Sequence, residues 1–280
     1  MKANDLKRFF SCKANRLNLS LLLIIALVIA CQTVPITGRQ QLSLVPSDTV
    51  LSMSYTNYHD FLSKHKVITN TDDTQTVKRV GQKIQYAVET FFSQNNLSDR
   101  LSGYRWEFNL IEDKSVNAWC MPGGKVVVYT GMIPVAKDDA GLAVVVGHEI
   151  AHAVAQHGDE RMSQGLLAQM GGVALSTALS QKPKETTNLF MTAYGLGTQV
   201  GVLLPYSRLQ ESEADRLGLI FMAMAGYDPH TAVDFWKRMA SASAKQGASP
   251  PEFLSTHPAD ESRIRNIEKL MPEAMQYYRK

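Results

Sequence analysis

The residues best suited to chemistry form the run His148-Glu149-Ile150-Ala151-His152. On an α-helix, residues four apart lie one turn above each other, so both imidazoles can point at one metal ion, and this spacing suits zinc. Glu149 lies about 100° around the helix from His148, where its carboxylate can reach a metal-bound water without being a ligand. The run therefore predicts a metal site with Glu149 as general base.

The residues on either side of this run are apolar, from Leu142 to Gly147 and again at Ala153 and Val154, which predicts a central, buried helix. A match by chance is expected on the order of once in 100 chains with this many histidines. Burying two histidines and a glutamate without partners would cost several kcal/mol. The side chains therefore need an ion or a hydrogen-bond network.

A catalytic zinc takes three protein ligands and leaves one position to water, so a further ligand must come from elsewhere. The best candidate segment runs from Ser207 to Asp215 and continues helically. Glu211 and Asp215 share one face at i and i+4, whereas Glu213 points away. We assign Glu211 as the third ligand and expect Asp215 to accept the second N–H of a ligating histidine. The alternative for so acidic a helix is a solvated face.

Periodicity indicates the elements that must position these residues. Helical spacing of apolar residues predicts two amphipathic helices, within 51–62 and 77–91. Alternating residues predict a strand over Tyr104–Ile111, and a β-branched run after a Pro-Gly-Gly turn predicts another over Lys125–Thr130. The sheet is therefore expected to be small.

From Asp138 onward the pattern is helical nearly throughout, with breaks at Gly158, 181–185, 204–205 and 226–229. The whole is an α+β layout in which helices dominate. Two apolar stretches, 166–179 and 189–204, are interpreted as a packed helical pair, since neither is long enough to span a bilayer without interruption. The alternative is that they dip into a nearby membrane.

Composition is that of a folded enzyme domain, with 280 residues, 45% hydrophobic and 20% charged. Of 29 basic and 26 acidic residues, five basic and one acidic precede residue 31, which leaves 24 and 25. The remaining chain is close to neutral, so nothing in its charge predicts nucleic-acid binding.

The first 30 residues resemble a bacterial secretion signal, with a basic start followed by the apolar run Leu21–Ala30. Val28-Ile29-Ala30-Cys31 also resembles the lipobox of bacterial lipoproteins, so Cys31 is expected to carry lipid and hold the chain to a membrane. The alternatives are an uncut signal anchor or a plain signal peptide. The expected organisation is signal peptide 1–30, tether 31–46 and catalytic domain 47–280. Gln32, where an aspartate would resemble an inner-membrane retention signal, points to the periplasmic face of the outer membrane.

Four motifs together resemble the family of zinc metalloendopeptidases that includes the bacterial proteases HtpX, BepA and LoiP, the prenyl-protein CaaX protease and the mitochondrial Oma protease. They are Asn117-Ala118-Trp119-Cys120-Met121-Pro122-Gly123-Gly124, Gly147-His148-Glu149-Ile150-Ala151-His152, Glu211-Ser212-Glu213-Ala214-Asp215 and Ser255-Thr256-His257-Pro258. The resemblance runs from about Ser47 to the C-terminus. It implies a mainly helical gluzincin-type domain with one Zn²⁺ per chain, held by His148, His152 and Glu211.

The resemblance also implies an edge strand beside the active-site helix, at Asn117, Ala118 and Trp119, that pairs with the extended backbone of a substrate. The alternative is a buried hairpin. For His257 it implies either a fourth, inhibitory ligand or a donor to the oxyanion, while a histidine before proline is otherwise a turn residue. Arg208 could stabilise the same oxyanion or pair with an acid.

The function that the resemblance implies is cleavage of internal peptide bonds in misfolded or stalled proteins of the bacterial cell envelope, by an enzyme that His257 could hold latent. The competing hypothesis is a metal-bound chaperone or outer-membrane assembly factor with little proteolytic activity. A zinc hydrolase acting on a non-peptide bond is a third.

Overall fold

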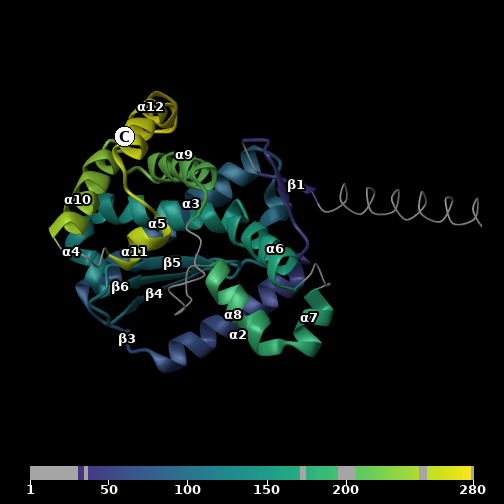
Figure 1. The fold of residues 1–280 in the computed structure, drawn as a ribbon. Helices are drawn as coiled ribbons and strands as arrows, with labels where there is room; N and C mark the ends of the chain where they lie inside the picture. The colour runs from purple at the N-terminus through teal and green to yellow at the C-terminus, as the bar shows by residue number, and fades with distance from the viewer. Residues whose placement is uncertain (1–30, 35–36, 171–174, 195–205, 246–250, 279–280) are drawn as a thin grey trace, which may run out of the picture.

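A computed structural model describes residues 31–34, 37–170, 175–194, 206–245 and 251–278 (Figure 1). The expected α+β fold, mainly helical with a small sheet, is confirmed. The predicted signal segment 1–30 lies outside the described residues. Within the described ranges, no helix has both the length and the apolar character needed to cross a membrane.

The α-helices are α2 Ser47–Lys64, α3 Asp72–Gln94, α4 Ile133–Ala136, α5 Asp139–Val154, α6 His157–Met170, α7 Leu175–Gln181, α8 Pro183–Ala193, α9 Arg208–Met224, α10 Thr231–Lys245, α11 Glu252–Thr256 and α12 Glu261–Tyr277. The strands are β1 Cys31–Thr33, β2 Gln40–Leu42, β3 Val67–Ile68, β4 Glu107–Ile111, β5 Ala118–Met121 and β6 Lys125–Tyr129. Two short 3₁₀ segments, η1 Ser98–Leu101 and η2 Thr130–Met132, complete the order.

The main sheet has the strand order β3-β4-β6-β5. Strands β4 and β6 are parallel, whereas the β3–β4 and β5–β6 pairs are antiparallel. The two strands predicted from the sequence are β4 and β6, although β4 begins only at Glu107. Strand β3, with two residues, is too short to produce a visible alternation.

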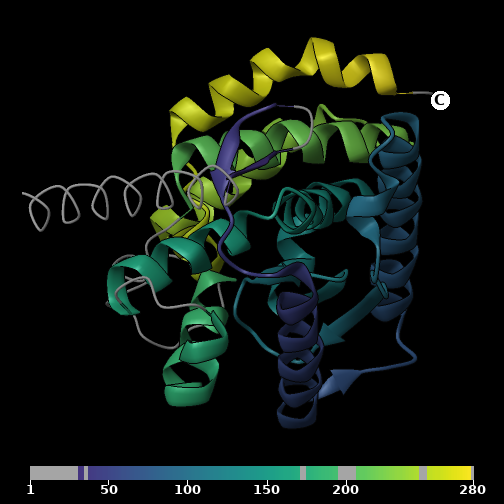
Figure 2. The same ribbon diagram turned by 90° about the vertical axis from the view of Figure 1, so that its right-hand side faces the viewer.

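The site is built where three helices are stacked over the sheet. In Figures 1 and 2, α12 lies over α9, α9 over α5, and α5 over the sheet, with α3 packed alongside. Helices α2 and α8 lie on the opposite side of the sheet. Helix α5 is therefore covered on all sides, and Gly141–Val154 is buried throughout.

Helix α5 begins and ends at residues that can be explained locally. The Asp138 side chain accepts a hydrogen bond from Gly141 N, 2.8 Å away, and caps the first turn. The helix ends at Val154 because Gln156 adopts a left-handed conformation, with φ of 60°. The predicted break at Gly158 was therefore wrong by two residues. Gly158 lies inside α6, where a Cβ atom would come 2.1 Å from the Tyr194 ring.

The helical pair expected at 166–179 and 189–204 lies only partly within the described residues. Helix α6 continues to Met170, α7 begins at Leu175, and α8 ends at Ala193. Residues 171–174 of the first expected helix and most of the second, 195–204, lie outside the described residues.

The segment expected to be a tether, 31–46, is packed against the domain in its described part. Strands β1 and β2 pair with each other in antiparallel register, from Cys31 opposite Leu42 to Thr33 opposite Gln40. Val34 and Val45 are buried in the hydrophobic core, at 1% and 3% exposed. These apolar side chains gain free energy by burial, so the ordered domain begins before Ser47.

Candidate metal centre

Helices α5 and α9 cross with their backbones in contact, at Gly147 and Gly218. A Cβ atom on Gly218 would lie 3.0 Å from His148 N, and one on Gly147 would lie 3.1 Å from Gly218 O. Glycine suits this approach, because a Cβ atom at either position would press on backbone atoms that have to move by a few tenths of an ångström. The crossing places the histidines of α5 opposite the acidic residues of α9.

Helix α9 starts with a capping box. The Ser207 hydroxyl accepts from Gln210 N at 3.2 Å, and the Gln210 side chain accepts from Ser207 N at 3.1 Å. This cap places Glu211 in the first turn of the helix and Asp215 one turn later on the same face. Both carboxylates are buried, at 6% exposed.

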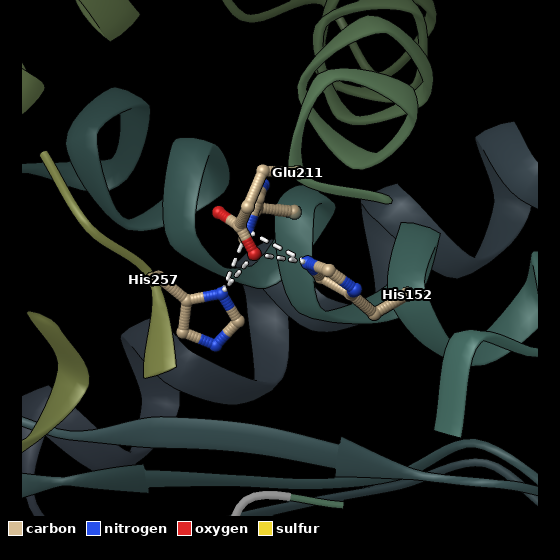
Figure 3. A group of neighbouring side chains, drawn as sticks. His152, Glu211 and His257 are labelled. Carbon is tan, nitrogen blue, oxygen red and sulfur yellow. Dashed lines mark hydrogen bonds and ion pairs between the residues drawn. The ribbon is translucent and has the colours of Figure 1, made fainter. Parts of the chain in front are cut away.

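Four buried side chains offer ligand atoms that lie within 4.8 Å of one another: His148, His152, Glu211 and His257. In Figure 3 the side chains of His152, Glu211 and His257 converge on one point from α5, α9 and the segment after α11. The three ligands predicted from sequence are thus brought together, and His257 joins them.

The spacing of these atoms fits a tetrahedral ion. His148 Nε2 lies 3.0 Å from His152 Nε2 and 3.2 Å from His257 Nδ1. Glu211 Oε1 lies 3.2 Å from His152 Nε2 and 2.9 Å from His257 Nδ1. Ligands about 2.0 Å from a zinc ion are about 3.3 Å from each other, so the group needs only small shifts to hold one. Nitrogen and carboxylate donors are also what zinc prefers.

Asp215 lies beside His148, the candidate ligand that it was expected to support. Its Oδ1 is 3.1 Å from His148 Nδ1, so it can accept that N–H and leave Nε2 of the ring for a metal. Burial alone would lower the pKa of His148, but the bonds to Asp215 and Glu211 outweigh it and raise the pKa to about 9. The surroundings of His148 thus favour positive charge.

Glu149 faces the same space without belonging to the ligand group. Its side chain is 4% exposed, and Oε1 has no hydrogen-bond partner among the described residues, with His257 Nε2 at 3.4 Å. Burial raises the pKa of the Glu149 carboxyl, and the nearby rings of His257 and His148 oppose this only in part. A buried carboxylate with a raised pKa is suited to proton transfer.

Two acidic residues of α9, Glu211 and Asp215, are neutralised by an arginine that the sequence analysis missed. Arg263 of α12 is 2.7 Å from Glu211 Oε2 through Nη1 and 2.7 Å from Asp215 Oδ1 through Nη2. Burial would raise the pKa of Glu211, but the charge of Arg263 and the neighbouring rings hold it well below its usual value. Nothing local in the sequence pairs Arg263 with residues about 50 positions earlier.

The predicted role of Arg208 has less geometric support. Arg208 is exposed and is the first residue of α9. Hydrogen bonds from Ser262 and from Arg263 N lower the pKa of Asp260, and the charge of Arg208 lowers it further by a smaller amount. It lines a cavity of about 230 Å³ that Glu211 and Arg263 also line. The arginine that touches the ligand group is Arg263.

The expected edge strand is β5, next to α5 in space and paired only with β6 among the described strands. Asn117, Ala118 and Trp119 are 3–5% exposed, so the edge is covered in this conformation. At the start of the strand, Phe253 N donates to Val116 O at 3.1 Å. Substrate binding by this strand remains a prediction, and it requires the cover to move.

Two further residues, His157 and Glu213, lie behind the metal centre, and His157 contacts His152 directly. His157 Nδ1 lies 2.9 Å from His152 Nδ1, and His157 Nε2 lies 3.2 Å from Glu213 Oε2. Burial lowers the pKa of His157 and so favours its neutral ring, while the hydrogen bond to Glu213 opposes part of this effect. Glu213 does point away from the ligand group, as expected, but it is buried and paired. No local spacing indicates this contact, because a helix break separates His157 from His152.

Comparison with known proteins agrees with this geometry. Residues 78–271 match the model of peptidase family M48. The chain belongs to peptidase family M48. It is 34% identical over 244 residues to the mitochondrial metalloendopeptidase OMA1 of Schizosaccharomyces pombe, covering 86% of this chain and 66% of the relative. The family resemblance inferred from the four motifs is thereby confirmed.

Other relatives of this M48 member are matched over shorter stretches. The mitochondrial metalloendopeptidase OMA1 of Saccharomyces cerevisiae is 34% identical over 183 residues, 64% of this chain and 50% of the relative. The beta-barrel assembly-enhancing protease of Escherichia coli is 30% identical over 166 residues, 57% of this chain and 33% of the relative. The chain thus spans between a third and two thirds of the length of these relatives.

Proposed function

We propose that this M48 member is a zinc metalloendopeptidase that hydrolyses internal peptide bonds. The observation that carries the proposal is the buried, converging group of His148, His152 and Glu211 beside the buried carboxylate of Glu149, whose Oε1 accepts no hydrogen bond from the described residues. One zinc ion per chain would be held by these three ligands. The names of the relatives, which are endopeptidases and a protease, support the reaction class.

The chemistry follows from the position of each side chain. A bound zinc would polarise the scissile carbonyl and lower the pKa of its water. Glu149 would act as the general base and then return the proton to the leaving amine, a role for which its burial and raised pKa are suited. Asp215 holds the His148 ring in the tautomer that leaves Nε2 free. His257 or Arg208 would donate to the developing oxyanion.

We propose protein substrates, bound as an extra strand on β5 at Asn117, Ala118 and Trp119. Main-chain hydrogen bonds would hold an extended substrate with little regard to its side chains, as misfolded or stalled proteins require. Residues of β5 also contact α5, which carries the histidines and Glu149. A peptide on this edge would therefore pass the ligand group.

The direct test is digestion of casein by the full-length chain in detergent, with zinc content measured on the same samples. Wild type should bind about one zinc and cleave casein. Glu149→Gln should keep the zinc and lose activity by about 10²- to 10⁴-fold, the usual contribution of a general base. Casein digestion by Glu149→Gln at the wild-type rate would refute the mechanism.

His257 provides a reason to consider a latent protease, or a metal-bound chaperone or assembly factor. Its Nδ1 is 2.9 Å from Glu211 Oε1 and 3.2 Å from His148 Nε2, close to the separation of about 3.3 Å between two ligands of one zinc ion. A fourth protein ligand would occupy the position that water needs. The covered edge of β5 also supports a latent or inactive state, because a substrate strand could not pair with it in this conformation.

Comparing wild type with His257→Ala separates these functions. An inert wild type and an active His257→Ala identify a latent protease that His257 closes. An active wild type that loses activity in His257→Ala identifies a donor to the oxyanion. If both proteins bind zinc and neither cleaves, the chaperone or assembly function is favoured.

We further propose that the chain is held to a bacterial envelope membrane, at the periplasmic face of the outer membrane, by lipid on Cys31. The support is the residue pattern of the first 31 positions. Fractionation tests it, because Cys31→Ser should lose the lipid and shift the protein from the membrane to the soluble fraction. A Cys31→Ser protein that carries the wild-type mass of lipid would contradict the assignment.

A further inference from the structure

The N-terminal segment Thr37–Val45, here called the strap, contacts the acidic residues behind the metal centre. Thr37 Oγ1 donates to Glu213 Oε1 at 2.6 Å. Arg39 Nε donates to both oxygens of Glu213, at 2.9 and 3.1 Å. The other two nitrogens of Arg39 donate to the two oxygens of Glu160, each at 2.9 Å. One guanidinium thus joins a glutamate of α9 to a glutamate of α6.

The rest of the strap is fixed along the same helices. Gln41 Nε2 donates to Ala155 O at 3.0 Å, in the break between α5 and α6. Leu44 N donates to Ser163 Oγ at 2.9 Å on α6. Val45 is 3% exposed. The strap is therefore held at several points, and Arg39 is positioned by its neighbours rather than by one ion pair alone.

From Glu213 a chain of contacts leads to a candidate metal ligand. Ionised Glu213 only accepts, so His157 Nε2, 3.2 Å away, is the protonated nitrogen of that ring. His157 Nδ1 then accepts, and His152 Nδ1 at 2.9 Å donates to it. The lone pair of His152 is thereby left on Nε2, which is the atom that faces Glu211 and His148.

The two histidines of α5 are thus supported in different ways. His148 has a carboxylate of its own, Asp215, at 3.1 Å. His152 reaches a carboxylate only through His157, and that carboxylate, Glu213, is 3% exposed. A buried carboxylate needs a partner to stay ionised, and Arg39 is the cation that supplies it. The support of His152 therefore depends on a residue about 110 positions earlier in the chain.

We propose that Arg39 of the strap is a positioning residue of the metal centre: it holds Glu213, and through His157 it fixes the ring orientation and tautomer of His152. This proposal rests on the proposed function, because it takes zinc as the ion that His152 binds. It also makes the strap, which begins six residues after Cys31, part of the support of the metal centre. Displacing the strap should weaken metal binding even though no strap residue touches the ion.

The test measures zinc affinity of the full-length chain in detergent by competition with a chromophoric chelator. Arg39→Met keeps the aliphatic length and removes the charge, and it should weaken zinc binding by about 10- to 100-fold, as loss of a ligand's supporting partner does. The matched control is Arg216→Met, which breaks a similar two-bond pair, with Glu273, at 2.7 and 2.9 Å. Arg216→Met should bind zinc like wild type.

A second pair of variants distinguishes positioning from general damage. His157→Phe keeps a ring but offers His152 no acceptor, whereas His157→Gln offers a side-chain oxygen. Zinc affinity should fall in His157→Phe and recover in part in His157→Gln. The absorption spectrum of the cobalt(II)-substituted protein should change in Arg39→Met and His157→Phe, and stay unchanged in Arg216→Met.

A double-mutant cycle completes the test. If Arg39 acts through His157, the losses of zinc affinity in Arg39→Met and His157→Phe should not add in the double variant. Arg39→Lys, a milder change, should lie between wild type and Arg39→Met. If wild type binds zinc tightly and Arg39→Met binds it as well as Arg216→Met does, the role of Arg39 is overturned while the proposed function stands. A wild type without zinc affinity overturns the proposed function as well.

Discussion

Arg263 and Asp215 face each other across the contact between α12 and α9 and form two hydrogen bonds, of 2.7 and 2.8 Å. Both side chains are buried, at 7% and 6% exposed, and the guanidinium lies 3.5 Å from the centre of the Trp236 ring. Arg263 also contacts Glu211. The C-terminal helix therefore supplies the cation that lets two carboxylates remain ionised beside the histidines.

The first prediction concerns the stability that this pair provides. Arg263→Met should lower the free energy of unfolding by about 3–5 kcal/mol, because it leaves Asp215 and Glu211 buried without their cation. Urea unfolding in the presence of a chelator measures this free energy, because no bound metal then adds to the stability of either protein. Arg216→Met, which removes a partly exposed pair, should cost less than about 1 kcal/mol. Equal losses in the two variants would contradict this account.

The second prediction concerns the close crossing of α5 and α9. In Gly218→Ala the new Cβ would lie 3.0–3.1 Å from backbone atoms of Gly147 and His148, which cannot rotate away. The helices must separate, at a cost of about 1–3 kcal/mol. Because His148 and Glu211 lie on opposite helices, zinc affinity should fall together with stability.

The control for Gly218→Ala is Gly165→Ala on α6. There the new Cβ would meet the side chain of Leu189, at 2.4 Å, which can change rotamer. Zinc affinity of Gly165→Ala should match that of wild type. A Gly218→Ala protein with unchanged zinc affinity would mean that the backbone contact does not set the separation of the ligands.

The parts of the site that could be predicted from the sequence are those that one helix determines alone. Residues four apart share a face, so the relative positions of His148 and His152, and of Glu211 and Asp215, follow from spacing. Glu211 was assigned as the acid that faces the histidines, and the structure places it there. The same spacing argument predicted that Glu213 points away from the histidines of α5 that could bind a metal, and its side chain instead contacts His157 and Arg39.

The partners that could not be predicted are joined by tertiary packing. Arg263 lies 48 positions from Asp215, and Arg39 lies 174 positions from Glu213. No periodicity links such residues. The segment 31–46 was predicted to be a tether because Pro35, Gly38 and Pro46 interrupt its few apolar residues, so that no periodicity indicates packing. The break before α6 was misplaced for a similar reason, because Gln156 rather than a glycine adopts the positive φ.

The third prediction separates a metal ligand from the residue that supports one. Glu211→Ala should reduce zinc affinity by more than Asp215→Asn, for which about 10- to 100-fold is expected, since Asp215 acts only through His148. Zinc content after dialysis and chelator competition give both values. Full retention of zinc in Glu211→Ala would mean that His257, the fourth member of the group, is the true third ligand.

The fourth prediction concerns Asp159 of α6, whose carboxyl is buried and accepts a hydrogen bond from the Tyr194 hydroxyl. Burial raises its pKa from 3.8 to about 6, with the Tyr194 bond opposing only part of the rise. Between about pH 4 and 6 the folded state thus binds more protons than the unfolded state. Stability should therefore fall as pH rises through this window, by about 3 kcal/mol in total.

Asp159→Asn removes this titration and keeps an oxygen that can accept from Tyr194. Relative to wild type, the variant should gain up to about 3 kcal/mol in stability between pH 4 and pH 7.5, measured by urea unfolding at constant ionic strength. Other titrating groups cancel in the comparison, since both proteins contain them. Asp60→Asn, at an exposed position, is the control and should differ from wild type equally at both pH values. If Asp159→Asn behaves like this control, Asp159 ionises as freely in the folded chain as in the unfolded one.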